Sequence, residues 1–296
     1  MPPLRPLLPA LSLLFLLTAI GAATVAARAE EDPLLAQGDA AWARRAEGHH
    51  GGQAAAGPID AALAAYEAAV KAHPQELDGY WKLLRAIHFK GEYVARTAAE
   101  KQAAFGRGRE VAEAALDLLG ARVGGRARLD KLSPQATAKA LAGVPHAVDV
   151  YLWGGADWGL WGDAFGKLAA ARQGVGDRVR QYALVAIALD ERYANAGGHR
   201  MLGRLHTLAP KIPFFTGWVD HDLAVAELRK AVELGPEDPD NSLFLAEALL
   251  EFQPAKRAEA LAILRRLGTV QPAADQQVEQ EKTLAQAQAL LARQKG

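Results

Sequence analysis

Apolar residues recur at spacings of three and four along most of the chain, which is the pattern of helices that bury one face. Half of all residues are apolar, alanine is abundant, and the runs of β-branched residues that would indicate strands are scarce. We therefore predict an all-α fold with a large core.

Three of the predicted helices share one order of residues. A small residue is followed by an apolar residue four positions later, by a second apolar residue three positions after that, and by a proline five positions further on. The copies are Ala62, Tyr66, Ala69 and Pro74; Ala224, Leu228, Ala231 and Pro236; and Ala260, Leu264, Leu267 and Pro272. The last two copies are offset by 36 residues, close to the roughly 34-residue period of tetratricopeptide (TPR) repeats.

This order has a physical meaning in a helical hairpin. The small residue lets the second helix approach the first, the two apolar residues lie on one buried face, and the proline ends the helix before the next hairpin begins. First helices fit after two of the copies, in LDGYWKLLRAIHFKGEY and DPDNSLFLAEALLEF. We predict TPR-like hairpins; an alanine-rich helical bundle without repeats is the alternative.

The repeats are interrupted in the middle of the chain, so the predicted organisation is uneven. We expect a single all-α TPR-like domain over residues 30–296, with a flexible insertion near 47–57. A specialised aromatic centre occupies about 145–220, and a C-terminal capping helix is predicted at about 275–293.

The N-terminal residues have the layout of a secretory signal peptide. Arg5 precedes an apolar run from Leu7 to about Ala27, and Ala29 completes a small-x-small cleavage site. We predict a signal peptide over residues 1–29 and a periplasmic location for the mature chain. An uncleaved membrane anchor is the alternative, because the apolar run is almost long enough to span a bilayer.

Composition excludes several kinds of site and partner. The chain has no cysteine, which excludes disulfides, thiolate metal sites, cysteine nucleophiles and a lipid-modified N-terminal cysteine. Its 34 basic and 34 acidic residues balance, so we expect neither nucleic acid nor an anionic membrane as a partner.

The sequence also lacks the common motifs of catalysis. It has no G-x-S-x-G, no H-E-x-x-H, no Walker loop and no dinucleotide fingerprint. His49 and His50 are adjacent but lack companion ligands at metal-site spacing. We therefore predict a protein that is not an enzyme, with no catalytic residue, no metal and no cofactor.

The aromatic centre contains an unusual helix. Trp153, Trp158 and Trp161 fall within nine residues and are interleaved with four glycines. Glycine is unfavourable inside a helix, so this pattern indicates a close approach of the backbone to another group. That group is either a neighbouring helix or a ligand in an aromatic-lined cavity, with Asp157 and Asp163 at its mouth.

Residues 197–218 (GGHRMLGRLHTLAPKIPFFTGW) form a second unusual segment. Two glycines break the preceding helix and place His199 and Arg200 at the start of the next one, where a carboxylate or phosphate would be favoured. Gly203 lies where a first helix needs a close contact. Three aromatic residues follow, which either plug the gap between hairpins or form the lip of a binding site. They are Phe214, Phe215 and Trp218.

The order of these segments resembles the T-component (TatT) family, the periplasmic TPR-like partners of TPR-protein-associated TRAP transporters. The resemblance is carried by YLWGGADWGLWGDAF, GGHRMLGRLHTLAPKIPFFTGW and AVAELRKAVELGPEDPDNSLFLAEALLE, and is strongest from about Tyr151 to Glu251. It implies a non-enzymatic, cryptic-TPR protein that binds a TRAP-type solute-binding protein and forms oligomers, with trimers as the precedent. It also implies a hydrophobic internal cavity for a small apolar ligand.

The resemblance further implies which residues form this cavity. His199, Arg200 and Arg204 belong to the matching motif, as either binding or structural residues. The implied lining residues are Trp153, Trp158, Trp161, Phe214, Phe215 and Trp218.

The chain departs from the family in one respect. Members of the family can be lipoproteins, whereas this chain has no cysteine, so the same membrane tether is not expected. A general exported TPR scaffold for envelope complexes is the alternative function, and a helical hydrolase is a weaker third.

The signal-peptide prediction can be tested directly. We expect the protein isolated from the periplasm to begin at Glu30, because Ala29 is the last residue of the cleavage site. N-terminal sequencing together with the intact mass checks this. A chain that still begins at Met1 and sediments with membranes would instead indicate a retained anchor.

Overall fold

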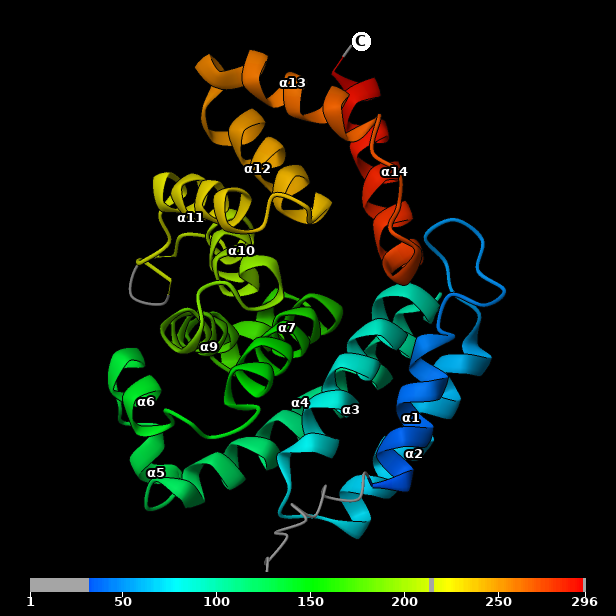
Figure 1. Cartoon of the computed structure of the whole chain (residues 1–296). Helices are drawn as coiled ribbons and strands as arrows, with labels where there is room; N and C mark the ends of the chain where they lie inside the picture. The colour runs from blue at the N-terminus through cyan, green and yellow to red at the C-terminus, as the bar shows by residue number, and fades with distance from the viewer. Residues whose placement is uncertain (1–31, 213–215, 295–296) are drawn as a thin grey trace, which may run out of the picture. The chain divides into compact units, whose positions relative to one another are not determined.

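The computed structural model describes residues 32–212 and 216–294 of the chain. Every regular element in these ranges is a helix, which confirms the predicted all-α class (Figure 1). The predicted signal peptide lies outside the described residues. Among the helices that are described, none combines the length and the apolar character needed to cross a membrane.

Helices that follow one another along the chain pack as TPR-like hairpins (Figure 1). Within the described ranges the first and second helices pair five times, and a last helix, α14 (Gln277–Arg293), follows the fifth hairpin. The pairs are α1 (Pro33–Ala43) with α2 (Ala56–Ala72), α3 (Leu77–Phe89) with α4 (Ala98–Arg122), α7 (Ala147–Phe165) with α9 (Val175–Leu189), α10 (Tyr193–Leu208) with α11 (His221–Leu234), and α12 (Pro239–Phe252) with α13 (Arg257–Leu267).

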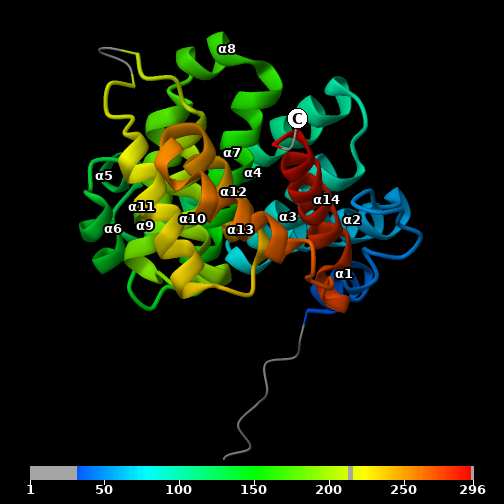
Figure 2. The same ribbon diagram turned by 90° about the horizontal axis from the view of Figure 1, so that it is seen from above.

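Short elements fill the connections between these hairpins. The helix α6 packs on α9, and α8 continues from α7 at the margin of the neighbouring helices (Figure 2). These connections account for the interruption of the repeats in the middle of the sequence. The short elements are the π-helical turn η1 (Lys90–Val94), α5 (Arg126–Leu129), α6 (Pro134–Ala140), α8 (Lys167–Arg172), and the 3-10 turns η2 (Pro254–Lys256) and η3 (Ala274–Gln276).

The repeated order of small and apolar residues is confirmed as a burial pattern. All nine small and apolar positions of the three copies are buried, and they lie on the second helices α2, α11 and α13. A fourth copy occurs on α4, where Ala112, Leu116 and Leu119 are buried in the same order. There Gly124, with a φ of 92°, occupies the position of the proline. Glycine ends this helix in a left-handed turn that other residues rarely adopt.

Two of the hairpins depend on a glycine of the first helix that touches a large residue of the second. A Cβ atom added at Gly38 of α1 would lie 2.3 Å from Tyr66 Cε1 on α2. A Cβ added at Gly203 of α10 would lie 2.6 Å from Leu228 Cγ on α11. Both large residues belong to the repeated pattern and are fully buried. The prediction of a close contact at Gly203 is thus confirmed.

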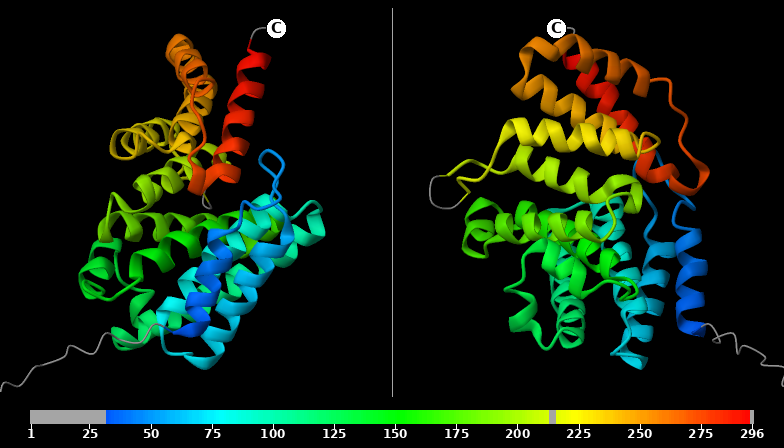
Figure 3. Two further views of the ribbon diagram at one scale, coloured as in Figure 1. Left: turned by 45° about the vertical axis from the view of Figure 1, so that its right-hand side comes forward. Right: turned by 60° about the vertical axis from the view of Figure 1, so that its left-hand side comes forward.

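The last helix, α14, contacts both the last hairpin and residues that belong to the first two hairpins. It packs on α12 and α13, as a capping helix should, and it also reaches the first hairpins (Figure 3). Arg45 Nε, just after α1, donates to Glu279 Oε1 at 2.7 Å, and Lys282 Nζ donates to Glu92 Oε2 at 2.8 Å. The capping helix therefore joins the two ends through ion pairs.

The segment 47–57, predicted to be a flexible insertion, makes specific contacts with other parts of the chain. Gln53 Nε2 donates to the carbonyl oxygens of Tyr93 (2.7 Å) and Val94 (3.0 Å). The backbone of Gly52 lies against Lys282 of α14 so closely that an added Cβ would be 2.4 Å from Lys282 Cβ. The glycines that suggested flexibility permit this close packing.

The helix α10 begins with a turn that the sequence did not indicate. Ala194, Asn195 and Ala196 all have left-handed backbone angles, with φ between 50° and 61°. Such angles are unfavourable for residues with a side chain. The carbonyl oxygen of Asn195 accepts a hydrogen bond of 2.9 Å from Asn241 Nδ2, which is fully buried on α12. The break therefore lies just before Gly197, where the glycine pair had predicted it, but the strained residues precede the glycines.

We expect Gly203→Ala to destabilise the protein by about 1–3 kcal/mol, because the new methyl group must displace the buried Leu228. Gly106→Ala is the matched control, since Gly106 also lies inside a helix but has no atom within 4 Å of an added Cβ. Alanine there should stabilise by about 0.5–1 kcal/mol through helix propensity. Urea denaturation of both variants checks the difference; equal effects would mean that the α10–α11 contact is not close.

Candidate binding site

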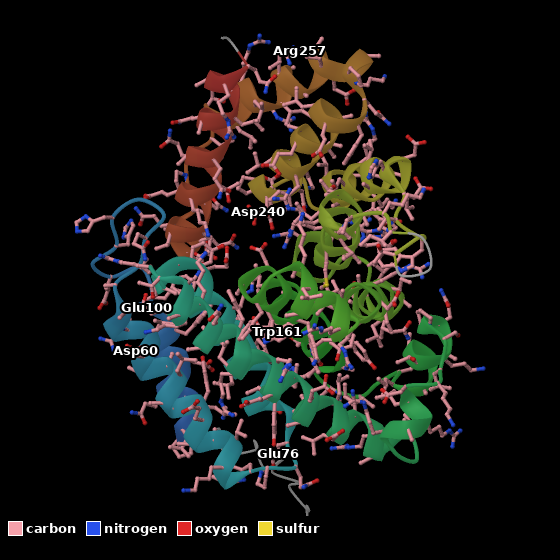
Figure 4. The ribbon with its side chains drawn as sticks, turned by 180° about the vertical axis from the view of Figure 1, so that it is seen from behind. Asp60, Glu76, Glu100, Trp161, Asp240 and Arg257 are labelled. Carbon is pink, nitrogen blue, oxygen red and sulfur yellow. The ribbon has the colours of Figure 1, made fainter. Side chains whose placement is uncertain are left out.

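Three of the tryptophans predicted to line one cavity lie on α7, and the fourth, Trp218, lies between α10 and α11. Trp158 and Trp161 are buried on α7 with ring centroids 5.9 Å apart, and Trp161 points among the packed helices (Figure 4). Trp218, far from them along the chain, donates its indole N–H to Asp177 at 2.6 Å. Phe214 and Phe215 lie outside the described residues. Of the described aromatic residues, Trp158 lines a hollow that does not include Trp153, Trp161 or Trp218, and a cavity common to all of them stays a prediction.

Trp158 does line a surface hollow of about 580 Å³ between α4, α7 and α9. Its indole N–H donates to Glu113 Oε1 at 3.1 Å, and Arg178, whose guanidinium lies 4.5 Å from the ring, donates to the same carboxylate at 2.8 Å. Glu113 also accepts from Arg126 at 2.8 Å. The polar groups of this hollow therefore pair with one another.

A second hollow, of about 830 Å³, lies between α6, α9 and the start of α7. Apolar residues such as Leu141, Leu184 and Ile187 line it, with Lys139 and Gln135 among its polar residues. It includes none of the residues that the sequence predicted for a site.

Three of the basic residues of α10, those that the sequence predicted for a site, are paired within the chain. His199 Nδ1 donates to Glu227 Oε2 at 2.6 Å, and Arg200 donates to Asp238 Oδ2 at 2.7 Å. Arg204 pairs with Glu247 of α12. His199 and Arg200, predicted to receive an anionic ligand, are thus paired with carboxylates on α11 and just before α12 of the same chain, and the binding of a ligand there stays a prediction.

Asp157 was expected at the mouth of a cavity and is instead completely buried on α7. Neither carboxylate oxygen has a hydrogen-bond partner among the described residues, and Oδ1 lies 3.7 Å from His88 Nδ1. An added Cβ at Gly108 of α4 would be 2.5 Å from Oδ2, so the carboxylate faces α4. Burial raises the pKa of Asp157 to about 6, while the neighbouring His88 opposes this shift.

A different group of residues has the properties of a binding site. We call it the Arg85 cluster, and its members lie on the first helices of three successive hairpins. Four of them are aromatic or imidazole rings and the fifth is an arginine. All five are partly exposed, so solvent reaches the group. The cluster consists of Trp42 of α1, Trp81, Arg85 and His88 of α3, and Trp153 of α7.

Short distances connect the members of the Arg85 cluster. The Arg85 guanidinium carbon lies 4.1 Å from the centroid of the Trp42 ring and 4.8 Å from that of the Trp81 ring. On the next turn of α3, the His88 ring lies 5.4 Å from the Trp153 ring. Arginine stacked between two indoles keeps the hydrogens at the edge of its plane available for a ligand.

Four polar atoms of the cluster are buried and have no hydrogen-bond partner among the described residues. Buried polar atoms are nearly always hydrogen-bonded in proteins, to protein or to water. Tyr66 lies within reach of Arg85, and Tyr193 lies within reach of Trp153. Three of the four are N–H donors. The atoms are Trp81 Nε1, Arg85 Nε, His88 Nδ1 and Trp153 Nε1.

The sequence analysis found Trp153 but missed the members on α1 and α3. A signal was present, because Trp81, Arg85 and His88 are spaced by four and three residues and so share one face of a first helix. The same helix buries Leu83, Leu84 and Ile87 on other faces, so its apolar pattern predicts the first helix of a hairpin and not a site. Arg85 lies opposite Trp42 only in the folded chain.

The donors of the cluster suit binding better than metal or acid–base chemistry. In the two described ranges, no three histidine or acidic side chains gather in a way that could hold a metal ion. Burial lowers the pKa of Arg85, but an arginine remains charged at neutral pH. The cluster therefore contains a charged arginine and N–H donors. Its indole rings also contact other side chains, because Arg45 lies 4.6 Å from the Trp42 ring and His146 stacks on Trp81 at 5.4 Å.

Comparisons with known proteins do not assign the chain to a family. No protein-family profile matches the sequence, and no curated protein matches it either. Among solved structures, the chain is similar to a thermophilic TPR protein of Thermus thermophilus, with 20% sequence identity and a TM-score of 0.49. The similarity covers 86% of this chain and 97% of that one.

The buried carboxyl of Asp157 predicts a pH-dependent stability. Its pKa rises from the ordinary 3.8 to about 6 on folding, so the folded state holds the proton more tightly and loses stability as the pH rises from about 4 to about 6. We expect Asp157→Asn to stabilise the protein at pH 8 by up to about 3 kcal/mol, and to have little effect near pH 4.

Asp163 is the control, because it lies on the same helix and is exposed. Asp163→Asn should leave the pH dependence of unfolding unchanged. Chemical denaturation of the three proteins between pH 4 and pH 8 provides the measurement. If Asp157→Asn destabilises the protein equally at every pH, the carboxylate makes a bond that the structure does not show.

Proposed function

We propose that this chain is a non-enzymatic, TPR-like binding protein of the periplasm that acts as the accessory partner of a TRAP-type solute-binding protein. The observation that carries the binding role is the Arg85 cluster, whose unpaired donors lie on the first helices of consecutive hairpins. A cluster that served only to stabilise the fold would be expected to satisfy its own donors.

The transport partnership is supported by the placement of the segments that carry the family resemblance. The segment at Tyr151–Phe165 forms most of α7, the segment 197–218 includes most of α10, and the segment 224–251 covers most of α11 and α12. These helices pack against one another in sequence, α7 on α10, α10 on α11 and α11 on α12. The resembling segments thus form one continuous part of the hairpin array, and α7 contributes Trp153 to the cluster.

The positions of Trp158 and Trp161 bear on where this accessory protein would bind a ligand. Trp158 and Trp161 pack against α4 and arginines, with Arg109 4.9 Å from the Trp161 ring. A ligand would instead meet the cluster formed with α1 and α3. We therefore propose that the chain binds its solute-binding protein through the hairpin array and holds a small ligand at the Arg85 cluster. Oligomers, with the trimer of the resembling family as the first candidate, belong to the same proposal.

Affinity capture from a periplasmic extract of cells that make this protein tests the partnership. We expect the tagged full-length chain to retain a TRAP-type solute-binding protein, identified by mass spectrometry, and the variant Arg85→Met to retain it as well. The variant removes the charge of the cluster but leaves the surface of the hairpin array. An unrelated exported protein with the same tag is the control.

Two results would contradict the transport partnership. Recovery of envelope enzymes or assembly factors without any solute-binding protein would make the chain a general TPR scaffold. Recovery of the protein from the cytoplasmic fraction alone would contradict the proposed location.

A further inference from the structure

We propose that His206 is an acid-sensitive clamp, in which the neutral imidazole ring holds the start of α11 on the end of α10 and protonation of the ring releases it. The inference goes beyond the proposed binding role, because it concerns how the hairpin α10–α11 responds to acid. It follows from the hydrogen bond that His206 accepts, from the contacts that depend on this bond, and from the surroundings of the ring.

The hydrogen bond of His206 fixes which form of the ring is present. His206 lies in the last turn of α10 and is 1% exposed. The backbone N–H of Asp220 donates to His206 Nδ1 at 3.0 Å. A ring nitrogen that accepts a hydrogen bond carries no proton, so the ring is neutral and its single proton lies on Nε2. A proton added at Nδ1 would face the N–H of Asp220, and the bond would be lost.

This bond connects the end of one helix to the start of the next. The helices α10 and α11 lie side by side and form the fourth hairpin (Figure 1). Asp220 is the N-cap of α11, and its carboxylate accepts from the backbone N–H groups of Asp222 at 2.9 Å and Leu223 at 3.1 Å. Loss of the bond to His206 leaves this cap intact, so α11 stays helical while its first turn is no longer fixed to α10.

The His206 ring also supports Trp218. The two rings pack edge to face, with centroids 5.4 Å apart. Trp218 donates its indole N–H to Asp177 of α9 at 2.6 Å, and the Arg180 guanidinium, also on α9, lies 5.2 Å from its ring. Release of the clamp would therefore alter the contact of Trp218 with the preceding hairpin.

The surroundings of the ring disfavour its charged form. Nε2 is buried and has no hydrogen-bond partner in the two described ranges, so the charged ring would find no acceptor there. Burial and the charge of Arg180 on α9 lower the pKa of His206 below the ordinary 6.5, and His221 at the start of α11 acts in the same direction. The carboxylates of Asp220 and Glu227 oppose this shift without reversing it.

The direction of the pH dependence follows from this lowered pKa. The unfolded chain binds a proton at His206 with a pKa near 6.5, whereas the folded chain binds it only at lower pH. The clamp is therefore complete above pH 6.5 and weakens as the pH falls below that value. The buried Asp157 has the opposite effect, because its raised pKa favours the folded chain in acid. A loss confined to the start of α11 is thus distinct from general acid unfolding.

The other histidine of α10 makes a contact that tolerates acid. His199 Nδ1 lies 2.6 Å from Glu227 Oε2. A carboxylate accepts a hydrogen bond from a neutral or a charged imidazole, so protonation of His199 keeps this bond. The acid response of the hairpin therefore belongs to His206, whose partner is an N–H donor.

Hydrogen–deuterium exchange of the full-length chain tests the clamp at about pH 7.5 and pH 5, with exchange times corrected for the intrinsic effect of pH. We expect the peptide that covers residues 218–224 to lose protection about fivefold or more in acid, while α12 keeps its protection. His206→Asn should abolish this loss, because the amide oxygen can replace Nδ1 as the acceptor and is not protonated at either pH.

His221→Gln is the matched control, since His221 belongs to the same hairpin but is exposed and stacks on Phe252 at 3.9 Å. This variant should lose protection in acid like the unaltered protein. If His206→Asn does not fold, NMR of the imidazole nitrogens in the unaltered protein takes its place. It should show His206 neutral with its proton on Nε2 at the higher pH, and the loss of protection should follow protonation of this ring.

Several results would overturn the clamp. They are equal protection of residues 218–224 at both pH values, an equal acid loss in His206→Asn and the unaltered protein, and a His206 ring that is already charged at the higher pH. Loss of protection throughout the chain would indicate acid unfolding and would also overturn a local release. None of these measurements involves a partner or a ligand, so affinity capture can succeed where this test fails, and the reverse.

Discussion

Two hairpins of this protein depend on contacts in which a glycine of the first helix touches a large residue of the second. Such contacts bring the two helix axes close together and fix which side of each helix is buried. The remaining sides of the first helices then become available for polar and aromatic residues, and the Arg85 cluster occupies that position on α1, α3 and α7. The contacting pairs are Gly38 with Tyr66 in the first hairpin and Gly203 with Leu228 in the fourth.

Much of the fold could be predicted because burial leaves a periodic trace in the sequence. The second helices α2, α11 and α13 were found from small, apolar and proline positions, and those positions are buried. The copy on α4 was missed because Gly124 replaces the proline that marks the end of the others. On α9 the small position is taken by Arg178, which is used for the pair with Glu113, while Tyr182 and Val185 keep their buried positions. Thus the pattern fails where a residue of the repeat has a second role.

The candidate site was harder to predict, because its residues come from distant parts of the chain. Three tryptophans close together in the sequence predicted a site on α7. In the structure, Trp158 and Trp161 are buried among helices and arginines. Of the predicted residues, only Trp153 belongs to the Arg85 cluster, and its partners Trp42 and Arg85 lie in two earlier helices. The ion pair between Arg200 and Asp238 could not be predicted from the sequence either. Residue types indicate the available chemistry, whereas the fold decides which groups are already paired.

The contact between the last helix and the first hairpins has a consequence for the order of folding. Arg45 and Glu279 are 234 residues apart in the chain. Each hairpin can form from neighbouring residues, whereas the closing ion pairs require the ends of a long segment to meet, and such contacts form late. Folding therefore runs from hairpins to closure.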